Sequence, residues 1–232
     1  MYVQPPSCAN FFQGSNDSYL CAGMKKLICL ILVSIAATSA IFATSKAASG
    51  EAPRLDTATF ATGCFWCTQA TFQQLRGVVK VTAGFTGGHT PNPSYEEVCT
   101  GITGHAEACN IVFDPRVISF DTLLEVFFMV HDPTQLNRQG NDVGTQYRSA
   151  VFYHNQIQKR KAEYYIKKIN EEKAYPKPVV TQVVPFTVFY KAEDYHQDYY
   201  NRNGNVPYCK YVIQPEVEKF RKIFASKLRT EK

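Results

Sequence analysis

Residues 58–67 read Ala-Thr-Phe-Ala-Thr-Gly-Cys-Phe-Trp-Cys, and this is the most informative stretch of the chain. The apolar run over 58–62 predicts a strand, and residues 68–75 predict a helix, so Cys64 falls at a strand-to-helix turn. Unpaired backbone N–H groups and the positive dipole end at a helix N-terminus favour a thiolate. Such a position lowers the pKa of a thiol from its usual value of about 8.5. We therefore predict a redox-active or nucleophilic cysteine at position 64, ionised and open to substrate.

The other cysteines support redox chemistry more than a structural role. The chain has 8 cysteines, and an odd number follow residue 50: Cys64, Cys67, Cys99, Cys109 and Cys209. A pure disulfide framework is therefore a poor interpretation for a protein of this size. A Cys-x-x-Cys pair can be half of a zinc site, but no second pair or matching histidine pair is present. Cys99 and Cys109 are expected to be small buried apolar residues.

The N-terminal region has the pattern of a secretory signal peptide over residues 24–50. Met24-Lys25-Lys26 is a basic start, residues 27–37 are apolar, and Ser45-Lys46-Ala47 fits a small-x-small cleavage site. We expect residues 1–23 to be an unstructured upstream extension, with translation starting at Met24. The signal predicts a periplasmic or secreted protein. The alternatives are an uncleaved membrane anchor, or a cytoplasmic protein if the leader does not function.

Size and charge limit the class of protein. The chain has 232 residues and a formal net charge of +5, and the first 50 residues contribute a net charge of +2 to this total. A charge this mild does not favour nucleic-acid binding, and no RNA-binding or zinc-finger pattern is present. The length allows one sizeable core, which we expect over residues 51–232.

Strands and helices are predicted to alternate after residue 50, which favours sheet and helix in layers. The pattern does not decide between a mixed sheet and a doubly wound parallel sheet. Long loops over 84–93 and 134–146 are where a site would be built. Strands are predicted over 58–62, 78–85, 106–113, 148–153 and 177–184, and helices over 68–75, 94–100, 119–131, 155–173, 193–201 and 215–228.

Four residues outside the cysteine motif could supply protons or orient them. Glu107 lies in an apolar strand, where burial would raise its pKa and allow it to hold a proton near neutral pH. Tyr95 and Tyr147 are phenols that could orient or share that proton. Asp142 lies in a loop too rich in glycine to be a mere connection. Taken singly, each has an ordinary interpretation as a surface or turn residue.

Taken jointly, these residues lie in blocks that resemble a known family. The motif Gly63-Cys64-Phe65-Trp66 strongly resembles the active-site motif of peptide methionine sulfoxide reductases of the A type. The resemblance spans roughly residues 57 to 220. Its further blocks are residues 87–99, 101–107, 131–149, 192–197 and 208–209.

The resemblance implies an α+β fold, a two-layer α/β plait with a mixed central sheet. It implies thiol-dependent reduction of methionine S-sulfoxide, free or in proteins, and so the repair of oxidised proteins. No bound cofactor is expected, electrons come from a thioredoxin-like protein, and the chain is expected to be a monomer. The implied roles are Cys64 as nucleophile, Glu107 as acid, Tyr95 and Tyr147 as donors to the sulfoxide oxygen, Asp142 as part of their polar network, and Phe65 and Trp66 as an apolar cup for the S-methyl group.

The pattern leaves open which thiol resolves the Cys64 sulfenic acid, since many family members have glycine at the position of Cys67. Helical side chains three apart have Cβ atoms ~5–6 Å apart, whereas a disulfide needs ~3.5–4.5 Å, so the first turn must tighten. We expect Cys67 to resolve first and Cys209 to carry the bond to an exposed position. Two other classes stay open: a general thiol–disulfide oxidoreductase, and a non-catalytic module that binds methionine-containing peptides.

Overall fold

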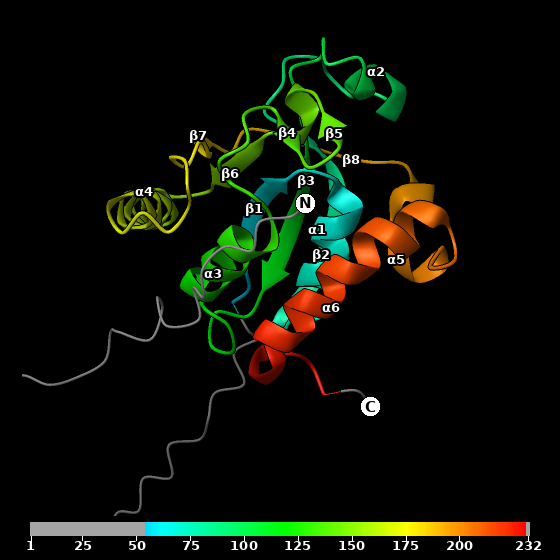
Figure 1. The fold of residues 1–232 in the computed structure, drawn as a ribbon. Helices are drawn as coiled ribbons and strands as arrows, with labels where there is room; N and C mark the ends of the chain where they lie inside the picture. The colour runs from blue at the N-terminus through cyan, green and yellow to red at the C-terminus, as the bar shows by residue number, and fades with distance from the viewer. Residues whose placement is uncertain (1–53, 231–232) are drawn as a thin grey trace, which may run out of the picture.

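A mixed sheet forms the centre of the computed structural model, which describes residues 54–230 (Figure 1). The six strands are β1 (Asp56–Thr62), β2 (Val78–Thr86), β3 (Ala106–Phe113), β6 (Ser149–Tyr153), β7 (Gln182–Pro185) and β8 (Phe189–Lys191). Their order across the sheet is β7-β6-β1-β3-β2-β8. The predicted upstream extension (1–23) and signal peptide (24–50) lie outside the described residues.

Strand direction confirms the mixed sheet. β1 pairs antiparallel with β3 and β6, and β2 pairs antiparallel with β3 and β8. β7 runs parallel to β6, and α4 (Gln156–Glu171) provides the crossover that a parallel pair requires. Because the central neighbours are antiparallel, the alternative of a doubly wound parallel sheet is wrong.

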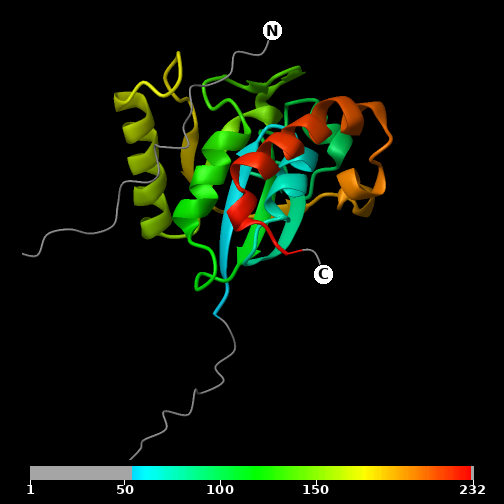
Figure 2. The same ribbon diagram turned by 60° about the horizontal axis from the view of Figure 1, so that its bottom comes forward.

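Four helices cover one face of the sheet, and α4 is one of them, because Ala162 and Ile169 belong to the same apolar cluster as Phe60. Figures 1 and 2 show α1 (Phe65–Phe72), α3 (Phe120–Val130) and α6 (Gln214–Ile223) on the same side. Phe60 of β1 points into this layer, with its ring centroid 5.7 Å from that of Phe72 and 5.0 Å from that of Phe127. Burying such rings removes large apolar areas from water, at about 25 cal/mol per Å². None of the helices within residues 54–230 is both long and apolar enough to cross a membrane.

The opposite face of the sheet carries small side chains. Ala61, Ala106 and Ala150 are fully buried there, and Phe186 and Phe189 pack against them. This face is therefore closed by a connecting segment and an edge strand rather than by a helical layer.

Short elements complete the architecture. They are α2 (Tyr95–Cys99), α5 (Tyr199–Arg202), the hairpin β4 (Arg138–Gln139) and β5 (Asp142–Val143), the 3-10 turns η2 (Thr145–Tyr147), η3 (Asp194–His196) and η5 (Ala225–Lys227), and the π-helical turn η4 (Cys209–Ile213).

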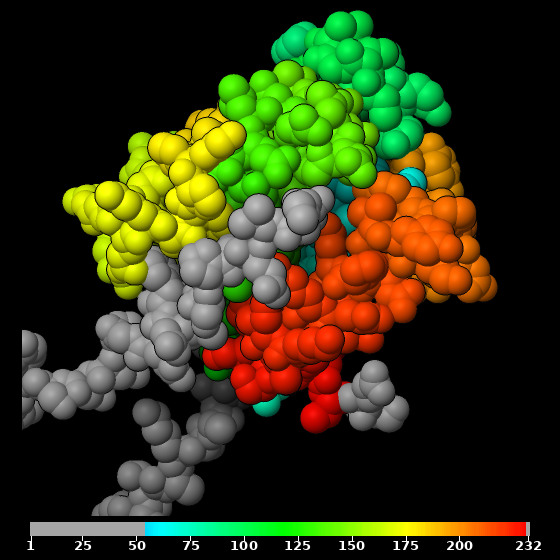
Figure 3. Space-filling model, viewed as in Figure 1, coloured from blue at the N-terminus to red at the C-terminus, as the bar shows by residue number. Residues whose placement is uncertain are grey.

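The C-terminal segment folds back over α1. The N–H of Arg76 donates to the carbonyl of Lys227 at 2.9 Å, and the N–H of Arg229 donates to the carbonyl of Gln74 at 2.9 Å. These bonds tie the end of the chain to the residues that follow α1. Figure 3 shows the segment, in orange and red, as a large part of the surface on this side.

Four predicted elements differ from the structure by more than two residues at one end, and one of them is the last helix, predicted over 215–228, which ends at Ile223. The first helix begins at Phe65 rather than 68, because packing of the two aromatic residues overrides their modest helix propensity. The strand predicted over 177–184 begins only at Gln182, since the backbone N–H of Val179 donates to the Asn170 side chain instead of a strand. The helix predicted over 193–201 is interrupted at Asp198, where φ is +54°. Strand β8 and the β4–β5 hairpin were not predicted.

Candidate active site

Cys64 is the N-cap residue of α1, directly after β1 and Gly63. Burial alone would raise the pKa of its thiol, but the Cys67 and Tyr208 side chains and the backbone N–H groups of Trp66 and Cys67 outweigh burial and lower that pKa. Neither backbone group makes a close capping bond to the sulfur, yet both belong to the first turn and direct positive charge toward it. The sulfur thus takes the place that an oxygen occupies in an ordinary N-cap.

The Cys64 side chain is less open than the sequence led us to expect. Cys64 is 8% exposed, so only a small part of the residue is open to solvent. The low exposure also means that charges near this sulfur are weakly screened by water, which strengthens their mutual effect on pKa.

Gly63 sets the turn that delivers Cys64 to the helix. Its φ is +100°, and a Cβ added there would lie 2.5 Å from Cβ of Gln139 in the hairpin. The turn therefore needs both the conformational freedom and the small size of glycine.

We expect Gly63→Ala to lower the free energy of unfolding by about 2–4 kcal/mol, from the strained φ and the clash with Gln139. Gly140→Ala is the matched control, because its φ is +58° and nothing lies within 4 Å of an added Cβ; it should cost only about 1–2 kcal/mol. Urea unfolding measures both. If both variants lost the same free energy of unfolding, the close approach of Gln139 to residue 63 would not contribute to stability.

Glu107 of β3 lies beside the same helix N-terminus. The backbone N–H of Phe65, the first residue of α1, donates to Oε2 of Glu107 at 3.0 Å. Glu107 is buried, and this burial, followed by the charge of Cys64, raises the pKa of its carboxyl well above the ordinary value. Although the Phe65 N–H opposes it, the net shift favours the protonated carboxyl beside a thiolate, which is the direction that the sequence predicted for a carboxyl in an apolar strand.

Tyr95 and Tyr147 approach Glu107 from two separate elements. Tyr95 opens α2, which begins with a capping box between Ser94 and Glu97. Tyr147 ends η2. Burial raises the pKa of both phenols, and the charge of Glu107 is the next cause in each. Both therefore remain protonated and can act as hydrogen-bond donors.

Asp142 of β5 meets a residue that was not predicted as part of the site. The Tyr208 hydroxyl donates to Oδ2 of Asp142 at 2.8 Å. The same phenol is also within hydrogen-bonding range of the Cys64 sulfur, and burial followed by the charge of Cys64 raises its pKa. One phenol carries one proton, so it can donate to only one of the two at a time. The sequence did hold a signal, since Tyr208 belongs to the family's tail block.

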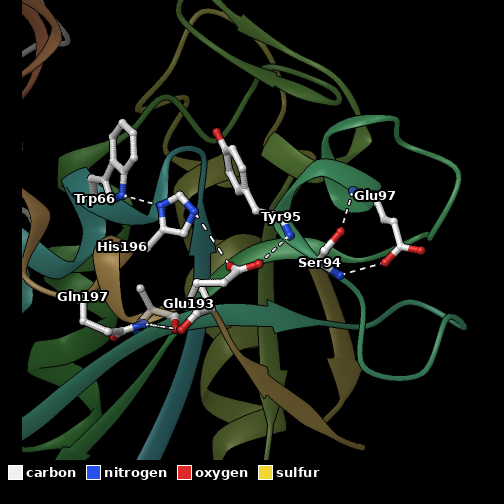
Figure 4. A network of polar contacts seen from close by, with 9 residues as sticks. Trp66, Ser94, Tyr95, Glu97, Glu193, His196 and Gln197 are labelled. Atoms are coloured by element: carbon white, nitrogen blue, oxygen red, sulfur yellow. Dashed lines mark hydrogen bonds and ion pairs between the residues drawn. The ribbon is translucent and has the colours of Figure 1, made fainter.

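The two aromatic residues of the motif have different environments. Phe65 is buried in the core, with its ring centroid 5.8 Å from that of Phe85. Trp66 is half-buried and stacks on Tyr199, with centroids 3.8 Å apart and planes 7° apart. Its Nε1–H donates to Nδ1 of His196 at 3.2 Å (Figure 4). Trp66 is thus the more accessible wall beside Cys64.

A second group of side chains surrounds Cys67, which packs against the same apolar cluster as Cys209 and interacts with Glu216. The pKa of the Cys67 thiol is raised well above its usual value by the hydrogen bond between Cys67 and Cys64, by burial, and by the charge of Cys64. Burial raises the pKa of Glu216 to about 7, although a hydrogen bond with Cys67 opposes this. Cys209 is fully buried against Ala70, so the expected exposed position is wrong for the reduced protein. Sequence reasoning did not identify Glu216.

The remaining cysteines divide between core and surface. Cys109 is fully buried, as expected, and its thiol donates to the Phe65 carbonyl at 3.5 Å. Cys99 was expected to be buried and is exposed, because it lies at the end of the short helix α2. All five cysteines within residues 54–230 are free. Within the same residues, no group of three or more His, Cys, Asp or Glu side chains could hold a metal ion.

Comparisons with known proteins agree with this geometry. A family model described as "Peptide methionine sulfoxide reductase" matches residues 56–228. The peptide methionine sulfoxide reductase MsrA of Sulfolobus acidocaldarius is 56% identical over 173 residues, which are 75% of this chain and 97% of that protein. An MsrA of Thermus thermophilus is 55% identical over 172 residues, 74% of this chain and 97% of that protein.

Solved structures agree as well. Methionine sulfoxide reductase A of Corynebacterium diphtheriae superimposes with a TM-score of 0.59 at 37% identity, covering 66% of this chain and 77% of that one. Mxr1 from Saccharomyces cerevisiae in reduced form gives 0.60 at 32% identity, covering 66% and 88%.

Proposed function

Because this chain belongs to the peptide methionine sulfoxide reductase family and is a reductase of the A type, we propose that it reduces methionine S-sulfoxide, free or in proteins, through the thiolate of Cys64. One observation carries the proposal. The first turn of α1 holds a thiol of lowered pKa at its cap and a protonated carboxyl, Glu107, on its first N–H.

The reductive step uses both groups. The Cys64 thiolate attacks the sulfoxide sulfur while Glu107 gives its proton to the sulfoxide oxygen. Tyr95 and Tyr147 donate hydrogen bonds to that oxygen, and Trp66 and Phe65 receive the S-methyl group. The sulfoxide sulfur is reduced by two electrons and leaves as methionine, while the Cys64 sulfur is oxidised by two electrons and keeps the oxygen as a sulfenic acid.

In the resolving step, Cys67 attacks the Cys64 sulfenic acid, and this becomes possible because Cys64 has lost its negative charge. As a thiolate, Cys64 holds the proton of Cys67 in place and raises its pKa. As a sulfenic acid it has no charge, so Cys67 can pass its proton to the nearby Glu216. The Cys67 sulfur then attacks the Cys64 sulfur, the S–O bond breaks, and the leaving hydroxide takes up the proton held by Glu216 and departs as water.

We expect Cys67→Ser to lose the first disulfide after one equivalent of sulfoxide, leaving a sulfenic acid on Cys64. Cys209→Ser should still form a Cys64–Cys67 disulfide. Intact-mass analysis and peptide mapping distinguish the species, with a sulfenic-acid trap added. A Cys67→Ser protein that forms its first disulfide at the wild-type rate would refute this order.

The proton acceptor has its own matched pair of variants. Glu216→Gln should slow formation of the Cys64–Cys67 disulfide, because the thiol loses its neighbouring base. Glu218→Gln, exposed on the same helix, should leave the rate unchanged. Stopped-flow mixing with sulfoxide measures both rates, and equal rates would remove Glu216 from the step.

The electrons that regenerate the enzyme are proposed to come from a thioredoxin-like dithiol, with no bound cofactor and a monomeric enzyme. Cys209 packs in the same cluster as Cys67, so a second exchange could move the disulfide to Cys209 after a local opening of the C-terminal segment. Recycling by a thioredoxin, compared between wild type and Cys209→Ser, tests this route. Equal recycling rates would exclude it.

We also propose export through the signal peptide over residues 24–50. A mature N-terminus near residue 48, determined on the exported protein by mass spectrometry, would support the proposal. A mature protein that begins at Met24 would count against cleavage.

Turnover of resolved S and R sulfoxide epimers with dithiothreitol is the decisive experiment. The proposed function requires turnover of the S epimer and little or none of the R epimer. Insulin reduction without sulfoxide turnover would favour a general thiol–disulfide oxidoreductase. Binding of methionine peptides that is unaffected by Cys64→Ser, with no turnover, would favour a binding module.

A further inference from the structure

A polar chain behind the site links Trp66 to Tyr95 and takes no part in the chemistry proposed above (Figure 4). The Trp66 Nε1–H donates to Nδ1 of His196 at 3.2 Å. An indole nitrogen can only donate, so Nδ1 must accept, and the proton of a neutral His196 lies on Nε2. Burial lowers the pKa of His196, although Glu193 and Glu96 oppose this, which favours that neutral form.

Glu193 extends this series of polar contacts on the other side of the His196 ring. Its Oε1 accepts from the backbone N–H of Tyr95 at 3.0 Å. Its Oε2 faces Nε2 of His196 at 3.9 Å, and neither of these two buried atoms has a hydrogen-bond partner among the described residues. The Nε2–H of His196 is therefore directed at the carboxylate, which favours the tautomer that Trp66 requires.

The His196 ring also fills the space between the walls of the site. His196 is 1% exposed, and its ring centroid lies 4.3 Å from that of Tyr95 and 5.6 Å from that of Trp66. A single side chain thus touches the aromatic wall on α1 and the phenol on α2, two elements far apart in the sequence.

We propose that His196 and Glu193 are a pair of positioning residues that, together with the stacking of Tyr199, fix the orientation of the Trp66 indole relative to Tyr95 and thereby set the size of the sulfur substituent that the enzyme accepts. This inference rests on the proposed function, in which Trp66 receives the S-methyl group. A wall held at a defined angle excludes a larger group, whereas a wall free to rotate admits it. The pair acts through Trp66 and Tyr95 and does not itself touch the substrate.

The test compares kcat/KM for the S epimers of methionine sulfoxide and ethionine sulfoxide, with dithiothreitol as reductant. One methylene group is commonly discriminated by about 10–200-fold. His196→Phe keeps an aromatic ring and removes the acceptor, so we expect the methyl-to-ethyl ratio to fall by about tenfold. His196→Asn keeps an acceptor near Nδ1 and should restore most of the ratio. His154→Phe replaces an exposed histidine elsewhere, one that contacts the Thr59 hydroxyl, and should leave the ratio unchanged.

Fluorescence gives an independent readout, because Trp66 is the single tryptophan of the chain. We expect His196→Phe to shift the Trp66 emission and increase its quenching by acrylamide, and His154→Phe to change neither. If His196→Phe fails to fold, Glu193→Gln replaces it, since its one amide oxygen cannot serve both Tyr95 and His196. That variant should shift the emission and the ratio in the same direction by a smaller factor.

The outcomes separate the two proposals. A folded His196→Phe protein with wild-type emission and a wild-type ratio would overturn the positioning pair. Changed emission with an unchanged ratio would also overturn it, because the contact would then be structural only. If the wild type reduces neither sulfoxide, the proposed function fails, while the emission of His196→Phe still reports whether the pair holds Trp66.

Discussion

Cys64→Ser is expected to abolish methionine sulfoxide reduction, with kcat/KM falling by at least about 10⁴-fold. A serine hydroxyl stays protonated at the helix cap, so it offers no strong nucleophile to the sulfoxide sulfur. It also cannot be oxidised to a sulfenic acid, so no oxygen can be transferred. Turnover with dithiothreitol measures the effect without dependence on the resolving cysteines.

Cys99→Ser is the matched control for that experiment. Cys99 is exposed and has no part in the proposed sulfur chemistry, and a serine there keeps a group that can hydrogen-bond to the neighbouring Tyr95, so its replacement should leave turnover near the wild-type value. Far-ultraviolet circular dichroism establishes that both variants are folded. Epimer-selective reduction that persists in Cys64→Ser would move the chemistry to another residue and end the mechanism given above.

Glu107→Gln is expected to lower kcat/KM by about 10²–10⁴-fold, the usual contribution of a general acid. The amide can still accept the Phe65 N–H, so the geometry of the first turn is kept while the transferable proton is lost. Glu125→Gln is the matched control, because Glu125 is half-buried, has a pKa raised by burial, and lies on α3 away from Cys64.

The dependence of the rate on pH separates Glu107 from Cys64. The lowered pKa of Cys64 means that the thiolate forms, and the rate rises, at lower pH than for an ordinary thiol. The raised pKa of Glu107 means that its proton is lost, and the rate falls, only well above the range of an ordinary carboxyl. We expect a bell-shaped profile in the wild type and loss of its basic limb in Glu107→Gln. The two groups interact, so the apparent values belong to the pair.

Sequence reasoning located the groups whose roles depend on local structure. Cys64 follows a strand and precedes a helix, and Glu107 lies within an apolar strand, so their environments could be predicted from their neighbours along the chain. The burial of Glu107 and the direction of its pKa shift confirm the second prediction. The first was only partly right, because the helix begins at Phe65 and the cysteine is its cap rather than a residue ahead of it.

Residues that reach the site by long-range packing could not be predicted in this way. Tyr208 and Glu216 come from a segment that returns across α1, and no local pattern states which face of that segment meets Cys67. The same reason explains Cys209, which is buried because its side of η4 packs on Ala70. Only the match of residues 192–197 and 208–209 to the family's blocks indicated that the tail matters.

The return of the C-terminal segment also affects how the protein is made. Cys64 and Glu107 leave the ribosome early, whereas Tyr208 and Glu216 emerge near the end of synthesis. Domains generally fold as units during translation. A nascent chain therefore carries its nucleophile without the phenol and the base that accompany it in the finished protein. Enzymatic competence arises only after nearly all of the polypeptide has been translated, so an unfinished copy released early would hold a cysteine that cannot complete a reductive cycle.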